Sequence, residues 1–315
     1  MGNRHQAGVA LITVLLTVAV LLTVASNLMR RHSLIISQNQ NSFEQNQALQ
    51  YALGAESLAR QGLFEDLSTG GPEVDHLGEL WAQPVLPFDL DEGGYLEAQL
   101  IDLQGCFNLN TVASSTTAID QFRRMLNNLG VQPQIAERWK DWIDDDQQVT
   151  GFGAEDSEYL LSEIPHRTPN TLVMNTSELR LMQNITAEEL ALLSPEVCAL
   201  PISESSLNVN TARLHALAAL DDAIAPGSIT GLTESPREYA NVSEFIADYP
   251  DFTAFAAQLS VNSEYFAMHA VAQVGETSVT LYSQLHRDPS TGEITVLSRD
   301  FAKLFRSNVA IEETH

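Results

Sequence analysis

Residues 9–29 read VALITVLLTVAVLLTVASNLM, an uninterrupted stretch without a charged side chain. At the rise of an α-helix this stretch spans roughly 30 Å, the thickness of the hydrocarbon core of a bilayer. Many of its residues are β-branched and would favour a strand in water, but lipid forces a helix because every backbone group must be bonded within the segment. The sequence therefore predicts a membrane-spanning helix near the N-terminus.

The flanks of this segment bear on how it is used. A conventional secretory signal has a shorter apolar core and ends in small residues suited to cleavage, whereas here Arg30-Arg31-His32 follows directly. The segment is therefore interpreted as a signal anchor or a single-span tether. Its orientation stays open on charge alone, because Arg4 precedes the span and Arg30 and Arg31 follow it.

Beyond the membrane segment, apolar residues between Leu34 and Leu63 recur at roughly helical spacing. The run Ser68-Thr69-Gly70-Gly71-Pro72 would end such a helix. We therefore expect one helix over 9–67, half of it in the membrane (9–29) and half amphipathic in water. Residues 73–94, which contain prolines and glycines, are expected to be irregular.

Alternating apolar and polar residues predict strands near both ends of the remaining chain. The expected strands are 95–103, 264–274, 278–286 and 293–299. Between them the pattern is mostly helical, over 118–130, 134–144, 177–183, 186–194, 211–220 and 242–257. A sheet that starts and later resumes indicates an insertion. The sequence thus predicts an α+β domain (68–108 and 262–305) with a helical domain (109–261) inserted in its sheet, and a tail at 306–315.

The charge balance limits the function. Asp and Glu number 41 against 16 Lys and Arg, a net charge of −25 in 315 residues. Phosphate backbones require basic side chains, so nucleic acid is excluded as a partner. The runs 107–111 and 207–212 are similar to each other, which indicates a repeated hairpin in the insertion. The segment 177–186 resembles helix-hairpin-helix units that bind DNA, yet the charge argues against DNA binding there as well. The two cysteines, Cys106 and Cys198, are too few for a four-thiolate metal site and could form one disulfide or stay buried thiols.

One loop is chemically distinctive. Between Asp141 and Glu163 lie eight Asp and Glu residues and no Lys or Arg. Such crowding of like charges destabilises a fold unless a cation neutralises it, and oxygen ligands on a glycine-containing loop suit Ca²⁺. The spacing does not match an EF-hand, and a solvated acidic loop remains the alternative. The expected ligands of a calcium site are Asp144, Asp146, Gln148, Glu155 and Asp156.

Enzymatic catalysis has no support in the sequence. It contains no Gly-x-Ser-x-Gly elbow, no phosphate-binding glycine loop and no zinc-type histidine pair. Carboxylates capable of acid–base chemistry are abundant, but spacing alone does not select a pair. We therefore expect a protein that is not an enzyme.

The first residues resemble the leader of type IV prepilin-like proteins. The segment is short and polar, ends at Gly8 and is followed by Val9-Ala10-Leu11-Ile12. The resemblance implies cleavage by a prepilin peptidase between Gly8 and Val9, methylation of Val9, a cytoplasmic N-terminus and a periplasmic body. The fifth residue after the cleavage point is glutamate in most of that superfamily, but here it is Thr13. This departure is typical of the K-type minor pseudopilins of type II secretion.

Further stretches extend the resemblance to that K-type family over nearly the whole chain. They are 74–79 (VDHLGE), 107–110 (FNLN), 141–144 (DWID), 153–156 (GAED) and 207–212 (LNVNTA). The resemblance implies a pseudopilin fold with a large, calcium-binding helical insertion. It also implies a ternary tip complex with I- and J-type minor pseudopilins, contacts with other pseudopilins and inner-membrane components, and a role in initiating or capping the pseudopilus that exports folded proteins.

Periplasmic placement, which follows from the resemblance, also bears on the cysteines. In an oxidising compartment Cys106 and Cys198 are expected to form a disulfide. Two other functions remain open: a membrane-tethered periplasmic enzyme, which would have a deep polar pocket with perturbed carboxylates in the insertion, and a minor type IV pilin or adhesin.

Overall fold

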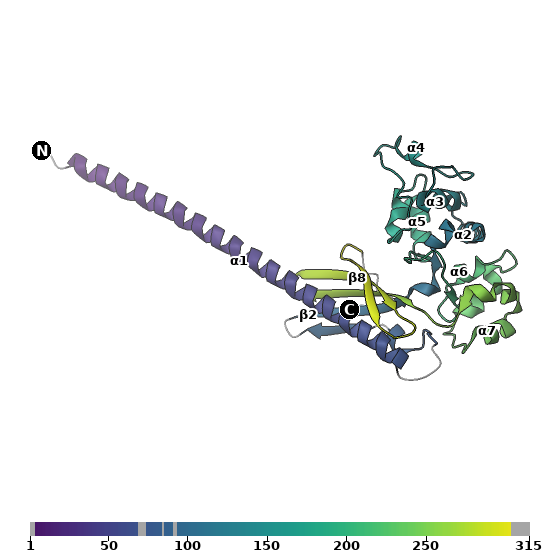
Figure 1. Ribbon diagram of the computed structural model, residues 1–315. Coiled ribbons are helices and arrows are strands. Elements are labelled where there is room, and N and C mark those ends of the chain that lie inside the picture. Colours follow the sequence, from purple (N-terminus) through teal and green to yellow (C-terminus); the bar gives the residue numbers. More distant parts are fainter. Residues whose placement is uncertain (1–3, 69–73, 84, 91–92, 304–315) are drawn as a thin grey trace.

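The computed structural model describes residues 4–68, 74–83, 85–90 and 93–303. The predicted C-terminal tail (306–315) lies outside the described residues, as do the first three residues of the predicted leader. Helix α1 (Arg4–Ser68) confirms the predicted long helix, begins before it and projects far from the rest of the molecule (Figure 1). Its outer part is long and apolar enough to cross a membrane, and none of that apolar window is buried in the fold.

The inner part of α1 packs on one face of a sheet. Ala48, Ala52 and Ala55 are buried there, and their small side chains let the helix lie close to the strands. Phe266 and Met268, both fully buried, fill the space opposite them. The apolar residues whose spacing predicts the half of the helix outside the membrane thus include those that pack on the sheet.

The sheet is antiparallel and five-stranded, in the order β1-β2-β7-β8-β9. Four strands match the predicted ones. The prediction that residues 73–94 are irregular was wrong in part, because β1 pairs with β2 at the edge of the sheet, where Pro87 costs no ladder bond. The strands are β1 (Val85–Leu90), β2 (Gly94–Asp102), β7 (Tyr265–Val274), β8 (Thr277–Arg287) and β9 (Ile294–Asp300).

The predicted insertion leaves the sheet at the end of β2 and returns at the start of β7. These two strands are neighbours and pair along their whole length, from Gly94↔Val274 to Asp102↔Phe266. The inserted segment forms two lobes beyond one end of the sheet, on the side away from the free end of α1 (Figure 1). Each lobe has its own apolar core.

Lobe 1 (residues 107–202) and lobe 2 (residues 207–263) consist mainly of short helices. Their α-helices are α2 (Thr116–Leu129), α3 (Ile135–Ile143), α4 (Asp156–Tyr159), α5 (Ala187–Leu193), α6 (Leu214–Ala218) and α7 (Val242–Asp248). The predicted helix 177–183 is a 3-10 helix, Thr176–Leu181. The predicted helix 242–257 breaks at Pro250, which has no backbone N–H, and continues as the 3-10 helix Pro250–Gln258.

The two lobes share one local design. Asn110 bonds the backbone of Val173 through both ends of its amide (2.8 and 3.0 Å), and Asn210 does the same to Tyr239 (3.1 and 2.8 Å). Each asparagine follows a short strand in a parallel pair that the sequence did not predict. These strands are β3 (Phe107–Asn108) with β4 (Val197–Cys198), and β5 (Leu207–Asn208) with β6 (Leu259–Ser260). The similarity of runs 107–111 and 207–212 therefore reflects a repeated fold.

Candidate functional site

The acidic loop of lobe 1 brings three carboxylates together. Asp144 and Asp146 directly follow α3, and Glu155 immediately precedes α4. One carboxylate oxygen from each of the three lies within 4.8 Å of the other two. Asp144 is 8% exposed and Glu155 only 2%, so two of the three side chains sit inside the lobe. We call these three residues the carboxylate cluster.

The carboxylate cluster has unsatisfied buried oxygens. Asp144 Oδ1 and both carboxylate oxygens of Glu155 make no hydrogen bond within the described part of the chain. Burial, reinforced by the negative charges of Asp141, Asp144 and Asp146, raises the pKa of Glu155 to about 7. Buried carboxylate oxygens without partners cost free energy, whereas a bound cation would satisfy them. The residues therefore fit a hard divalent cation, and the all-oxygen donor set favours Ca²⁺ or Mg²⁺ over Zn²⁺.

Neighbouring groups hold the cluster in shape. Lys140 Nζ lies 2.9 Å from Asp144 Oδ2, and the backbone N–H of Gln148 donates to Asp146 Oδ1 at 2.7 Å. Both oxygens of the fully buried Asp141 accept from the backbone N–H of Thr150 at 3.1 Å, which pins the loop to α3. Burial raises the pKa of Asp141 to about 6.

Gly153 lets the loop wrap this closely. A Cβ atom there would collide with the Asp141 carboxylate.

Two of the predicted ligands stand apart from this cluster. The Asp156 carboxylate accepts from the backbone N–H and the hydroxyl of Thr168 (2.9 and 3.0 Å) and pairs with Arg167 at 2.6 Å. Asp156 is the first residue of α4, and both of its carboxylate oxygens contact Thr168 or Arg167, so it lies outside the carboxylate cluster and its role as a ligand stays a prediction. Gln148 contributes a backbone donor to Asp146.

Asn170 is a candidate ligand that the sequence did not indicate. Its Nδ2 donates to the backbone carbonyl of Asp146 at 3.2 Å, while its Oδ1 is buried and has no partner among the described residues. Its φ of 49° places it in the left-handed region, where asparagine is one of the few tolerated side chains. An isolated Asn at this distance along the chain carries no signal in the sequence.

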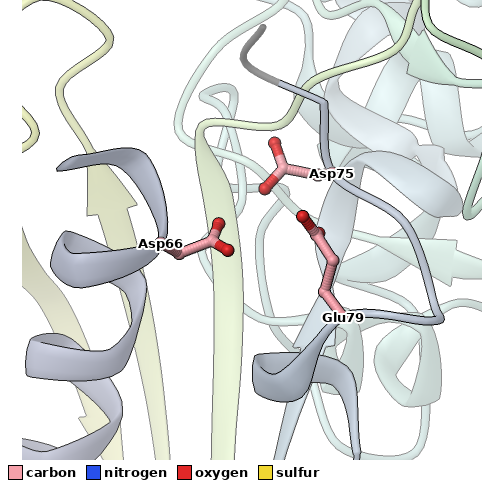
Figure 2. A group of neighbouring side chains, drawn as sticks. All are labelled: Asp66, Asp75 and Glu79. Carbon is pink, nitrogen blue, oxygen red and sulfur yellow. The ribbon is translucent and has the colours of Figure 1, made fainter. Parts of the chain in front are cut away.

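A second acidic group lies between α1 and the segment that follows it. Figure 2 shows Asp66 of α1 and Asp75 and Glu79 of that segment pointing toward one another. This group already has its cation, because Arg287 of β8 donates to Asp66 at 3.3 Å and to Asp75 at 2.6 Å. Glu79 accepts from Trp81 Nε1 at 2.7 Å. We therefore assign the group to the protein's internal structure and not to metal binding.

The cysteines and the membrane segment complete the predicted residues. Cys106 and Cys198 are joined as a disulfide, with their Cα atoms 5.9 Å apart. Thr13 lies on the exposed outer part of α1. Gly8 and Val9 lie within the helical backbone of α1.

A cavity of about 650 Å³ lies between the lobes, where an enzyme would place its substrate. It is lined mainly by hydroxyl and amide side chains, including those of Asn108, Ser115 and Gln121. Among the described residues that line it, Glu204 is the one acidic residue, and Asp141 and Glu155, whose pKa values are raised, do not line it. The tethered-enzyme alternative predicted perturbed carboxylates in such a pocket, and the cavity does not have them.

Comparisons with known proteins agree on one family. The family model described as type II secretion system (T2SS), protein K, matches residues 105–202. The type II secretion system protein K of Pseudomonas aeruginosa is 39% identical, with 96% of this chain and 94% of that protein covered. The protein of the same name from Aeromonas hydrophila is 32% identical over 89% of this chain and 92% of its own length.

A solved structure supports the same relationship. The match is to a chain of the GspK-GspI-GspJ complex from the enterotoxigenic Escherichia coli type 2 secretion system. The TM-score is 0.73 at 31% identity, with 85% of this chain and 99% of the other covered. This chain belongs to the type II secretion system protein K family.

Proposed function

We propose that this chain is a minor pseudopilin that initiates or caps the pseudopilus of a type II secretion system, in a ternary complex with I- and J-type minor pseudopilins. The observation that carries the proposal is the likeness, over 85% of this chain, to a protein crystallised with GspI and GspJ. The outer part of α1 anchors the chain in the inner membrane as a single span, and the sheet and both lobes occupy the periplasm.

The shape of the molecule supports a position at the tip. The two lobes lie beyond the sheet, at the end of the molecule farthest from the free end of α1 (Figure 1). The lobes would sterically hinder the addition of another subunit above this one. Thr13 supports the same position, because a carboxylate in the bilayer is costly without a partner and a tip subunit has no neighbour above to supply one.

Processing follows the prepilin pattern in this proposal. The prepilin peptidase cuts between Gly8 and Val9, and the new terminal amine of Val9 is methylated. The Cys106–Cys198 disulfide forms in the periplasm. The task of the protein is assembly and not catalysis, so its chemistry resides in binding sites.

Calcium is the proposed structural ligand. Asp144, Asp146 and Glu155 would coordinate it, with Asn170 Oδ1 as a further oxygen, and the ion would supply positive charge to the buried carboxylates. Other contacts within the chain orient the loop. Lys140 pairs with Asp144, and the backbone N–H of Gln148 donates to Asp146. Asp141 accepts from the backbone N–H of Thr150.

Co-purification tests the assembly proposal. The full-length chain, tagged and produced in membranes with I- and J-type partners, should be recovered with both in one complex after detergent extraction. A major pilin of a twitching system serves as the control bait. Recovery of neither partner, or equal recovery of both with the control, would contradict the proposal.

A further inference from the structure

The covalent connections between the inserted lobes and the sheet lie at one place, here called the crossing. The chain leaves at Asp102, the last residue of β2, and returns at Tyr265, the first residue of β7. Because β2 and β7 are neighbouring strands, both covalent connections lie at the same end of one strand pair. Two adjacent backbone connections can act as a hinge, so non-covalent contacts must set the direction of the lobes.

Buried polar side chains fill this crossing on the side of lobe 2. Asp102, 5% exposed, accepts through Oδ2 from Thr211 Oγ1 at 2.5 Å, from Ser263 Oγ at 2.6 Å and from Asn208 Nδ2 at 3.1 Å. All three donors belong to lobe 2, whereas Asp102 belongs to the sheet. A single carboxylate oxygen of the sheet thus collects three hydrogen bonds from the lobe.

A second carboxylate joins lobe 2 to the segment after α1. The backbone N–H of Asp75 donates to Val261 at 2.9 Å, and Asp75 Oδ2 accepts from the backbone N–H of Ser263 at 2.6 Å. Arg287 of β8 completes the arrangement, donating through Nη2 to Asp75 Oδ1 at 2.6 Å and to the Ser263 carbonyl at 2.8 Å. Asp75 and Arg287 are each 1% exposed, so this ion pair is removed from solvent.

We propose that Asp75, Asp102, Asn208, Ser263 and Arg287, together called the joint, fix the direction of lobe 2 relative to α1 and the sheet. Hydrogen bonds are directional, whereas apolar contacts tolerate sliding. Swinging the lobe would separate buried charges from their partners, and an uncompensated buried charge costs several kcal/mol. The joint therefore acts against rotation at the crossing, independently of any partner protein.

The joint also reaches the end of α1. Arg287 lies 3.3 Å from the carboxylate of Asp66 on α1, so the end of the long helix is joined to the same set of charges. If the chain itself sets the direction of lobe 2, the lobe is already aligned with α1 when the subunit joins a filament. This last consequence rests on the proposed function, whereas the joint itself does not.

Distances between spin labels in the full-length chain test the proposal. Gln50 on α1 and Ala254 in lobe 2 are both exposed, and Gln50→Cys with Ala254→Cys can be labelled in detergent without reduction of the Cys106–Cys198 disulfide. Asp102→Asn keeps the side-chain shape but presents an amide to three donors. Ser263→Ala removes the hydroxyl that donates to Asp102 and accepts from Asn208, and it leaves the backbone bonds of Ser263 in place.

The matched control is Glu56→Gln. Glu56 is also a buried carboxylate, 3% exposed, and accepts from Ser283 and Arg299, but both partners lie on the same sheet that α1 covers. We expect the distribution of distances between the two spin labels to broaden in Asp102→Asn and Ser263→Ala. We expect its width to stay unchanged in Glu56→Gln. Unchanged widths in both joint variants, or equal broadening in Glu56→Gln, would overturn the proposal.

Discussion

Asp144 and Glu155 place carboxylate oxygens within 4.8 Å of each other although both side chains are buried. Three of their four carboxylate oxygens accept no hydrogen bond in the described part of the chain. The fourth, Asp144 Oδ2, pairs with Lys140. Two buried carboxylates brought together in this way repel one another. This pair is the physical basis for expecting a cation in lobe 1.

Calcium should therefore bind and stabilise the protein. A ligand that binds the folded state alone adds about 2.7 kcal/mol of stability at a hundredfold excess over its Kd. We expect calorimetric heat on calcium titration and a higher Tm, with Glu155→Gln losing most of both effects. Asp145→Asn is the control, because Asp145 is an exposed neighbour in the same loop. A silent titration, or equal losses in the two variants, would count against the site.

The disulfide should contribute strongly to stability. Its cysteines are 92 positions apart, and closing a loop of that length contributes about 4 to 5 kcal/mol in the chain-entropy model. Replacing both cysteines by serine should lower the urea midpoint substantially in non-reducing buffer. The parent and the variant should converge once the parent is reduced. Two free thiols in the denatured, unreduced periplasmic protein would refute the pairing.

Thr13→Glu should disturb tip assembly. A carboxylate within the hydrocarbon core is costly unless it is paired, and the proposed tip position has no subunit above it to supply a partner. We expect weaker recovery of I- and J-type partners from membranes, measured against Thr13→Ser as the control. If Thr13→Glu assembles as well as Thr13→Ser, threonine is merely tolerated there.

The joint should give the protein a specific pH dependence. Burial raises the pKa of Asp75 to about 7, with the Asp102 charge adding to the effect and Arg287 opposing it. Because this pKa lies above its unfolded value of about 4, the stabilising contribution is complete at low pH and is lost as pH rises toward 7. The stability of the parent should fall relative to Asp75→Asn by up to about 1 kcal/mol per pH unit between pH 5 and 7.

Urea unfolding at several pH values in excess calcium measures this difference. The proposed calcium ion would keep the carboxylate cluster from titrating, and the other groups near Asp75 are the same in both proteins. Those groups are Asp66, His76, Glu79, Asp102 and Arg287. Parallel stability curves for the parent and Asp75→Asn, or a difference of the opposite sign, would rule out the titration of Asp75 as its source.

The sequence predicts the features of this fold that depend on local pattern. The charge-free run before Arg30 and the apolar spacing up to Leu63 predict α1, and alternation predicts four of the five sheet strands. Strand β1 is not evident in the sequence because Pro87 makes a short edge strand look like a loop, and the predicted helix 242–257 is too long because Pro250 ends it. Both errors concern proline and are correctable from sequence.

The candidate sites divide in the same way. Asp144, Asp146 and Glu155 were predicted because dense carboxylates in one loop are themselves a signal. Asp156 belongs to the same loop, but its carboxylate contacts Thr168 and Arg167. The direction of this side chain depends on tertiary structure, which the local sequence does not show. Asn170 in lobe 1, like the joint, depends on residues far apart in the chain, so no local pattern reveals either.

The position of this subunit in the filament tests the central claim most directly. Pseudopili assembled with a version of this chain that carries an epitope in the exposed part of lobe 2 can be labelled with gold-conjugated antibody and imaged by electron microscopy. The account predicts a single gold label at one end of each filament. Labels distributed along the filament length would contradict it.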